Sequence, residues 1–196
     1  MRIIAGSAGS IPLKVPRTLT RPTTDRVRES IFSVLGERVE GARVLDLFAG
    51  SGSLGLEALS RGAGAVDFIE SHGPACEAIA QNLQKTRLEG GRVHRREVMA
   101  FLVSVPPGRY DLVFADPPYV REEKDRELLE TLLGSALLAS ALAPGGLLVL
   151  ESLASAALPE TPLWSLTNER DYGTTRVSFL SPSIPSPLSP STPSPP

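Results

Sequence analysis

Residues 43–62 read RVLDLFAGSGSLGLEALSRG, and the rest of the architecture can be worked out from this stretch. Its first six residues form an apolar run that predicts a buried β-strand, and its last residues are helix-like. Between the two, Gly50, Gly52 and Gly55 satisfy the pattern G-x-G-x-x-G. Glycines permit a tight turn and a close approach of the backbone to a ligand, while the start of a helix offers unpaired N–H groups. The stretch therefore predicts a strand, a ligand-binding loop and a helix.

Strands and helices continue to alternate after this loop. Further strands are predicted at residues 65–70, 92–97, 110–116 and 146–152. Helices are predicted at residues 73–88, 99–105 and 123–142, and two runs at residues 163–169 and 175–180 are expected to pair as a hairpin. Such alternation is typical of a mostly parallel sheet with helices on both faces. Residues 41–180 are therefore interpreted as one doubly wound α/β domain.

The two ends of the chain differ from this domain. Residues 1–40 are interpreted as a small N-terminal arm, with a short hairpin and a helix that begins near Thr23 or Thr24. Residues 1–28 have a net charge of +5, whereas the whole chain has −2, so the arm is expected to meet a polyanion. Residues 181–196 contain seven Pro and six Ser and are expected to form a disordered tail.

The composition excludes several other classes of protein. One Cys and two His argue against a disulfide scaffold, a Cys-based zinc cluster and a His-rich metal site, so no metal is expected. Every apolar run is interrupted well before the roughly 18 residues that a membrane-spanning helix needs. The first ten residues also lack the apolar segment of a signal peptide. We expect a cytoplasmic protein that does not enter a membrane.

Asp46 indicates which cofactor the glycine loop binds. The loop alone also fits a dinucleotide dehydrogenase, but a carboxylate inside an apolar strand needs a partner, and an NAD site requires none there. A cofactor with a cationic sulfonium and an ammonium group would supply one. The spacing D-x-F-x-G-x-G resembles the first motif of S-adenosylmethionine-dependent methyltransferases.

Two further carboxylates complete the predicted cofactor site. Glu70 ends the second strand, where it can accept both hydrogens of a ribose diol. Glu97 ends the third strand and can either accept a hydrogen bond from the adenine amine or be a solvated surface charge. The predicted cofactor-binding residues are Asp46, Phe48, Gly50, Ser51, Gly52, Glu70 and Glu97.

A second motif, Asp116-Pro117-Pro118-Tyr119, follows the fourth strand and resembles the D/N-P-P-Y/F motif of methyltransferases that act on planar or amide nitrogens. An exocyclic amine is a poor nucleophile because its lone pair is delocalised into the ring. Hydrogen bonds from its N–H groups to the Asp116 carboxylate and the Pro117 carbonyl help to localise that pair. The prolines keep the turn rigid, and Tyr119 offers a face for base stacking, worth about 1–3 kcal/mol. We predict that these four residues are catalytic.

Five segments taken together resemble one family. They are MRIIAG at 1–6, RPTTDRVRESIF at 21–32, DLFAGSGSLGLEALSRGA at 46–63, DPPY at 116–119 and YGTTRVSFL at 172–180. They resemble the RsmD-type guanine-N2 methyltransferases of small-subunit (16S) ribosomal RNA. The resemblance implies a seven-stranded, Rossmann-like methyltransferase sheet with an antiparallel edge hairpin, and S-adenosylmethionine as the cofactor. It also implies that the substrate is a guanine of 16S ribosomal RNA within a small ribosomal subunit or an assembly intermediate.

Basic residues of the arm are the candidate RNA contacts: Lys14, Arg17, Arg21, Arg26 and Arg28. The family's usual basic run after MRIIAG is absent here, where residues 7–11 read SAGSI. Two alternative functions share parts of this pattern, namely a DNA adenine-N6 or cytosine-N4 methyltransferase and a non-catalytic RNA-binding assembly factor. A short chain without a target-recognition domain argues against the first, and an intact set of motif residues argues against the second. A monomer is expected.

Overall fold

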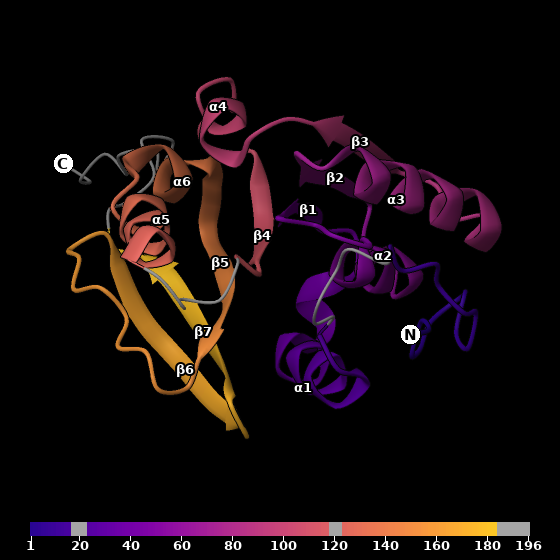
Figure 1. Ribbon diagram of the computed structural model, residues 1–196, viewed down its shortest axis with the longest axis horizontal. Helices are drawn as coiled ribbons and strands as arrows, with labels where there is room; N and C mark the ends of the chain where they lie inside the picture. Colours follow the sequence, from indigo (N-terminus) through magenta and orange to yellow (C-terminus); the bar gives the residue numbers. More distant parts are fainter. Residues whose placement is uncertain (17–22, 118–122, 184–196) are drawn as a thin grey trace, which may run out of the picture.

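A computed structural model describes residues 1–16, 23–117 and 123–183 of the chain. These residues form a seven-stranded sheet with the strand order β3-β2-β1-β4-β5-β7-β6 (Figure 1). The strands are β1 (Arg43–Leu47), β2 (Ala65–Glu70), β3 (Gly91–Arg95), β4 (Tyr110–Ala115), β5 (Leu142–Leu153), β6 (Trp164–Tyr172) and β7 (Thr175–Pro182). Strands β1 to β5 are parallel, whereas β7 is antiparallel to both β5 and β6. The predicted fold class and the edge hairpin are confirmed.

Helices cover both faces of this sheet. They are α1 (Asp25–Leu35), continued by a 3-10 turn (Gly36–Val39), α2 (Ser53–Ser60), α3 (Gly73–Thr86), α4 (Val98–Leu102), α5 (Glu123–Leu133) and α6 (Ala136–Ala141). One buried cluster joins the sheet to α1, α2 and α3, and a second joins it to α4, α5 and α6. In Figure 1, α1 and α2 accordingly lie on one side of the sheet and α5 and α6 on the other.

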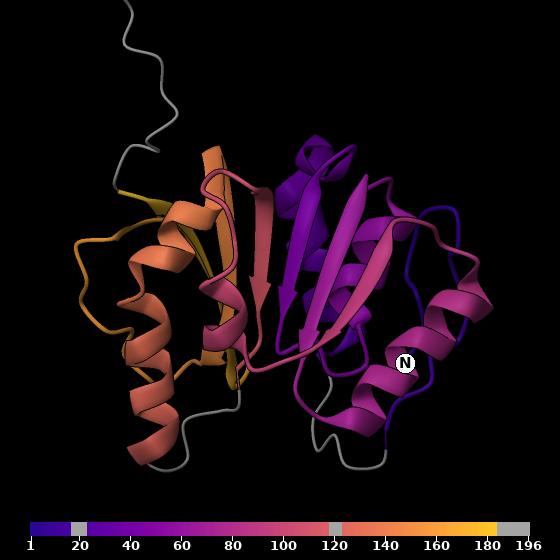
Figure 2. The same ribbon diagram turned by 90° about the horizontal axis from the view of Figure 1, so that it is seen from above.

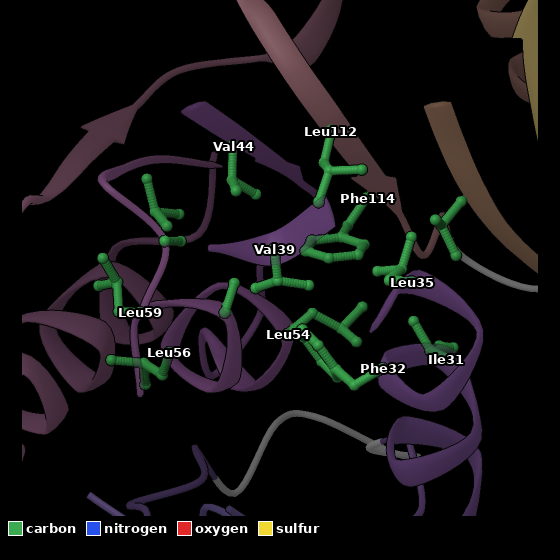
Figure 3. Packing of buried hydrophobic residues seen from close by; sticks show 14 of the residues in the cluster. Ile31, Phe32, Leu35, Val39, Val44, Leu54, Leu56, Leu59, Leu112 and Phe114 are labelled. Carbon is green, nitrogen blue, oxygen red and sulfur yellow. The ribbon is translucent and has the colours of Figure 1, made fainter. Parts of the chain in front are cut away.

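Helix α1 packs against the middle of the sheet through an apolar stripe. Its Phe32 and the Phe114 ring of β4 have centroids 5.7 Å apart, and Figure 3 shows Ile31 and Leu35 pointing into the same cluster. The helix begins as predicted, because the Thr24 side chain accepts a hydrogen bond from the N–H of Val27. Burial of these side chains fixes the start of α1 near the centre of the sheet.

The prediction of a single helix over residues 123–142 is wrong, because the structure has two helices there, α5 and α6. Gly134 follows the last residue of α5, and the Ser135 side chain caps α6 by accepting a hydrogen bond from the N–H of Leu138. A glycine next to a capping serine is a stop signal followed by a start signal, which the continuous apolar pattern concealed.

The first sixteen residues pack closely on α2 and α3. The predicted hairpin is reduced to one isolated bridge between Arg2 and Pro12. The backbone N–H groups of Ile4 and Ala5 donate to the buried carboxylate of Glu57 on α2, at 2.7 and 3.1 Å. Since Ile3, Ala8 and Leu13 are also part of the buried cluster, this segment shares the core of the domain.

The C-terminal boundary also differs slightly from the predicted one. Ser181 and Pro182 extend β7 and pair with β6, although both were assigned to the tail. The remainder of the predicted disordered tail, residues 184–196, lies outside the described residues. In the described part of the chain, no helix is long and apolar enough to span a membrane.

Candidate active site

The glycine loop connects β1 to α2 in a conformation that depends on left-handed residues. Phe48, Gly50 and Gly52 have φ angles of 56°, 56° and 77°. Glycine adopts such angles without steric cost, whereas Phe48 is a non-glycine exception of the kind found at functional sites. Gly52 is the N-cap residue of α2, so the loop ends directly at the N-terminus of that helix.

Gly55 and Asp46 join the first turn of α2 to the sheet. A Cβ atom on Gly55 would lie 2.3 Å from Cε1 of Phe68, so only glycine lets α2 pack this closely on β2. The N–H of Gly55 donates to Oδ2 of Asp46 at 2.9 Å, and Asp46 is only 2% exposed. Asp46 is therefore the buried strand carboxylate that the sequence predicted.

Two other side chains hold the loop from neighbouring elements. Oε2 of Glu70, at the end of β2, accepts a hydrogen bond from the N–H of Gly50 at 2.8 Å, and its Oε1 accepts one from the N–H of His72 at 2.8 Å. The amide of Asn82 on α3 donates to the carbonyl of Ser51 at 3.1 Å. The loop is thus anchored to β2 and α3 by side-chain hydrogen bonds, and Asn82 was not singled out from the sequence.

Asp116 lies beside this loop. Strand β4 is the neighbour of β1, with Leu47 opposite Ala115, and the two strands end at the same edge of the sheet (Figure 2). Asp116 directly follows β4 and is partly exposed, and Pro117 is buried. Pro118 and Tyr119, the other two predicted catalytic residues, lie outside the described residues. Chain topology therefore brings Asp116 and the glycine loop together.

Two residues that the sequence did not identify complete this edge of the sheet. The hydroxyl oxygen of Thr23 lies 2.7 Å from Oε1 of Glu151 on β5 and 3.2 Å from Oδ2 of Asp116. Thr23 is 8% exposed and Glu151 is 1% exposed. Thr23 is separated from Asp116 by 93 positions and from Glu151 by 128. The only local signal was a carboxylate in the otherwise apolar run of residues 146–152.

The three carboxylates at this edge have raised pKa values. Burial raises the pKa of Asp46 and of Glu151 well above their ordinary ranges, and the negative charge of Asp116 adds to both effects. Burial also raises the pKa of Asp116 to about 6, although the hydrogen bond from Thr23 opposes the shift. Clustered carboxylates with perturbed pKa values are typical of functional sites.

The structure gives the surroundings of three of the remaining predicted cofactor and RNA residues. Glu97 is exposed just before α4, and among the described residues its side chain has no hydrogen-bond or ion-pair partner. Lys14 is exposed beside α3, where its Nζ donates to Gln81 at 2.7 Å, and Arg26 is exposed on α1. Arg17 and Arg21 lie outside the described residues.

The prediction that Arg28 contacts RNA is corrected by the structure. Its side chain is fully buried, and its Nη2 donates to Oδ1 of Asp25 at 2.7 Å and to the carbonyl of Arg2 at 2.6 Å. The expectation that this guanidinium faces a phosphate is wrong for the described conformation, because the side chain does not reach solvent. Within the described residues, no group of three or more His, Cys, Asp or Glu side chains is arranged to hold a metal ion.

Comparison with known proteins agrees with this geometry. Residues 1–181 match the model of a family described as conserved hypothetical protein 95. Ribosomal RNA small subunit methyltransferase D of Escherichia coli K12 is 38% identical over 175 residues, which cover 88% of this chain and 85% of that protein. YlbH of Bacillus subtilis is 39% identical over 184 residues, which cover 91% of this chain and 97% of that protein.

Solved structures agree as well. The structure of yhhF from Escherichia coli superposes with a TM-score of 0.75 at 35% identity, covering 93% of this chain and 97% of that one. The family match over residues 1–181 includes the glycine loop and strands β1 to β6. The chain belongs to the conserved hypothetical protein 95 family, which includes the ribosomal RNA small subunit methyltransferase D enzymes.

Proposed function

We propose that this protein transfers a methyl group from S-adenosylmethionine to the exocyclic N2 amine of a guanine in small-subunit (16S) ribosomal RNA. The observation that supports this most directly is the adjacency of Asp116 to the glycine loop at the carboxyl edge of β1 and β4. Open α/β sheets bind their ligands at this edge. Membership in a family of ribosomal RNA methyltransferases supports the class of substrate.

The residues around the glycine loop fit a cationic cofactor. Asp46 is buried, and no basic side chain of the described residues pairs with it. A positively charged ligand group would offset the desolvation of this carboxylate and the nearby charges of Asp116 and Glu70. We expect Asp46 to face the cationic end of the cofactor. Glu70, with lone pairs beyond its two backbone hydrogen bonds, would accept the ribose hydroxyls.

S-adenosylmethionine supplies a methyl group that is activated by its bond to a sulfonium. Asp116 would accept an N–H of the guanine amine and so favour a pyramidal nitrogen with a localised lone pair. With the methyl group transferred from the sulfonium, the amine nitrogen would become cationic and lose one proton, for which the Asp116 carboxylate would be the positioned acceptor. Positioning of the amine against the methyl group provides the remaining acceleration.

The proposed RNA contacts are the exposed cations of the N-terminal segment. Lys14 and Arg26 are exposed, and Arg17 and Arg21 remain candidates from the sequence. Arg28 is omitted because it is buried and paired with Asp25. The proposal includes a monomer acting in the cytoplasm on a small ribosomal subunit or its assembly intermediate, where the target guanine is presented in a folded RNA.

Incubation with labelled S-adenosylmethionine tests this function. Unmethylated ribosomal RNA, small ribosomal subunits and DNA are offered separately, and the methylated nucleoside is identified by mass spectrometry. N2-methylguanosine from small-subunit RNA is expected. N6-methyladenine or N4-methylcytosine in DNA would replace the proposal with a DNA methyltransferase, and no methylation of any substrate would favour a non-catalytic assembly factor.

Two variants at opposite ends of β4, Asp111 on the strand and Asp116 directly after it, provide a matched pair for this assay. Asp116→Asn removes the proposed acceptor at the carboxyl end of β4 and is expected to lower kcat by about 10²–10⁴-fold. Asp111→Asn changes the same residue type at the amino end of β4, where it pairs with Arg43, and is expected to keep its methyl-transfer activity. Equal activity of both variants would remove Asp116 from the mechanism.

A further inference from the structure

Thr23 has a single hydroxyl proton but lies between two carboxylates, those of Glu151 and Asp116. Its Oγ1 is 2.7 Å from Oε1 of Glu151 and 3.2 Å from Oδ2 of Asp116. A hydroxyl can donate to one of these oxygens only, so its lone pair faces the other. A lone pair facing an ionised carboxylate is repelled, whereas a protonated carboxyl would donate to it. The geometry therefore requires one proton on the Asp116 and Glu151 pair.

Burial indicates which carboxyl holds this proton. Glu151 is 1% exposed, and its Oε2 has no hydrogen-bond partner in the described residues, so an ionised form would lack both water and a second donor. Asp116 is partly exposed and is closer to solvent. Because the cost of ionisation is larger for the more buried group, the proton belongs on Glu151 and the charge on Asp116.

We propose that protonated Glu151 donates to the Thr23 hydroxyl, which in turn donates to Asp116 and holds it as the ionised carboxylate that accepts the amine hydrogen. Thr23 and Glu151 are then positioning residues for methyl transfer. This inference rests on the proposed function for its role in catalysis, but the hydrogen-bond chain itself is a property of the free protein. After transfer, Asp116 returns its proton to water through its exposed side, while Glu151 keeps its own proton throughout the cycle.

The charged groups around the chain, among the described residues, agree with this arrangement. The charges of Asp116 on the loop after β4 and of Asp46 on β1 raise the pKa of Glu151, as does burial. The Arg28 guanidinium on α1 opposes this rise. Arg28 is paired with Asp25 through Nη2, and its Nε and Nη1 have no hydrogen-bond partner in the described residues. For Asp116, the hydrogen bond from Thr23 favours the ionised form.

Carboxyl ¹³C NMR titration of the free wild-type protein tests the chain without substrate or cofactor. Asp116 and Glu151 are assigned by the signals that disappear in Asp116→Asn and Glu151→Gln. Asp116 is expected to titrate near pH 6, and Glu151 to remain protonated at pH values where Asp116 is already ionised. Complete ionisation of Glu151 below the titration of Asp116 would overturn the proposal.

Three variants test the role of the hydroxyl and of the Glu151 proton. Thr23→Val should raise the pKa of Asp116 by about one to two units, since it removes a hydrogen bond to a charged group. Thr23→Ser should restore the wild-type value. Glu151→Gln keeps a neutral donor, so the pKa of Asp116 should stay within about half a unit. An unchanged pKa in Thr23→Val, or a fall of one unit or more in Glu151→Gln, would contradict the chain.

The pH dependence of kcat links the chain to catalysis. Thr23→Val should move the acid limb of the kcat profile to higher pH by the same one to two units. At a fixed pH on that limb, kcat should therefore fall about 10- to 100-fold, and Thr23→Ser should restore it. Thr86→Val is the matched control, because Thr86 is a threonine of similar burial, 7% exposed, on α3. A shift of equal size in Thr86→Val would mean that the effect is merely structural. Inactive wild-type protein would refute the proposed function and leave the NMR test standing.

Discussion

Replacing Asp116 by Asn is expected to stabilise the free protein at neutral pH, although the same variant is expected to lose most of its methyl-transfer activity. Burial raises the pKa of Asp116 from its ordinary value of 3.8 to about 6. In the unfolded chain the carboxyl titrates at its ordinary value, so between these two pH values the folded protein binds more protons than the unfolded one. The stability of the wild type therefore falls as the pH rises through this range.

The size of this effect follows from the same two values. A difference of about 2.2 pH units corresponds to about 3 kcal/mol at 1.36 kcal/mol per unit. The Asn side chain has the same shape and keeps an oxygen that can accept from Thr23, so the variant removes the charge and leaves the contact. The free energy of unfolding of Asp116→Asn should equal that of the wild type near pH 3.8 and exceed it by up to about 3 kcal/mol above pH 6.

Urea unfolding at several pH values between about 4 and 8 measures this difference. Asp111→Asn provides a control of opposite sign, because hydrogen bonds from Arg43 lower the pKa of Asp111. That carboxylate contributes stability above its ordinary pKa and loses the contribution as the pH falls through its lowered value, so Asp111→Asn should be less stable than the wild type at neutral pH. A difference between Asp116→Asn and the wild type that stays constant with pH would refute the reasoning.

Three further variants have defined outcomes. Gly55→Ala should lower the free energy of unfolding by about 1–3 kcal/mol in urea titrations, because its Cβ would lie 2.3 Å from the Phe68 ring; wild-type stability would mean that α2 can move away at no cost. Glu70→Ala should weaken S-adenosylmethionine binding by about 1–3 kcal/mol in calorimetry, since a loop N–H loses its acceptor, and unchanged affinity would exclude this anchor from the cofactor site. Replacing Lys14 and Arg26 by Ala should reduce the slope of log binding constant for RNA against log salt concentration by about 0.7–0.9 for each phosphate that is no longer neutralised. A slope equal to that of the wild type would show that neither residue contacts RNA.

Local patterns predicted the fold and the two motifs of the site. An apolar strand followed by spaced glycines has one common structural solution, and a carboxylate after a parallel strand must lie at the ligand-binding edge. Asp46 and Asp116 could therefore be placed from the sequence alone. The need for glycine at position 55 could also be inferred, since the third glycine of such loops allows close packing of helix and strand.

Contacts between distant segments account for what the sequence did not show. Thr23 was considered as a helix cap, but Thr24 fills that role and Thr23 instead contacts Glu151. Arg28 is a cationic residue in a basic segment and was therefore predicted to contact RNA, yet its side chain lies on the buried face of α1. Neither outcome follows from local pattern, because each depends on which element packs against α1 in three dimensions.

The hydrogen bond between Thr23 and Glu151 also constrains the order of folding. It joins residues that are 128 positions apart, while the N-terminal segment additionally needs Glu57 on α2 as its acceptor. A chain synthesised from its N-terminus contains α1 long before β5 exists, so the start of α1 must wait for most of the domain before it docks. The cofactor loop and the first strands can form earlier in synthesis. The completed carboxylate cluster is thus among the last parts to assemble, and a nascent chain gains its methyl-transfer site only when β5 has joined the sheet.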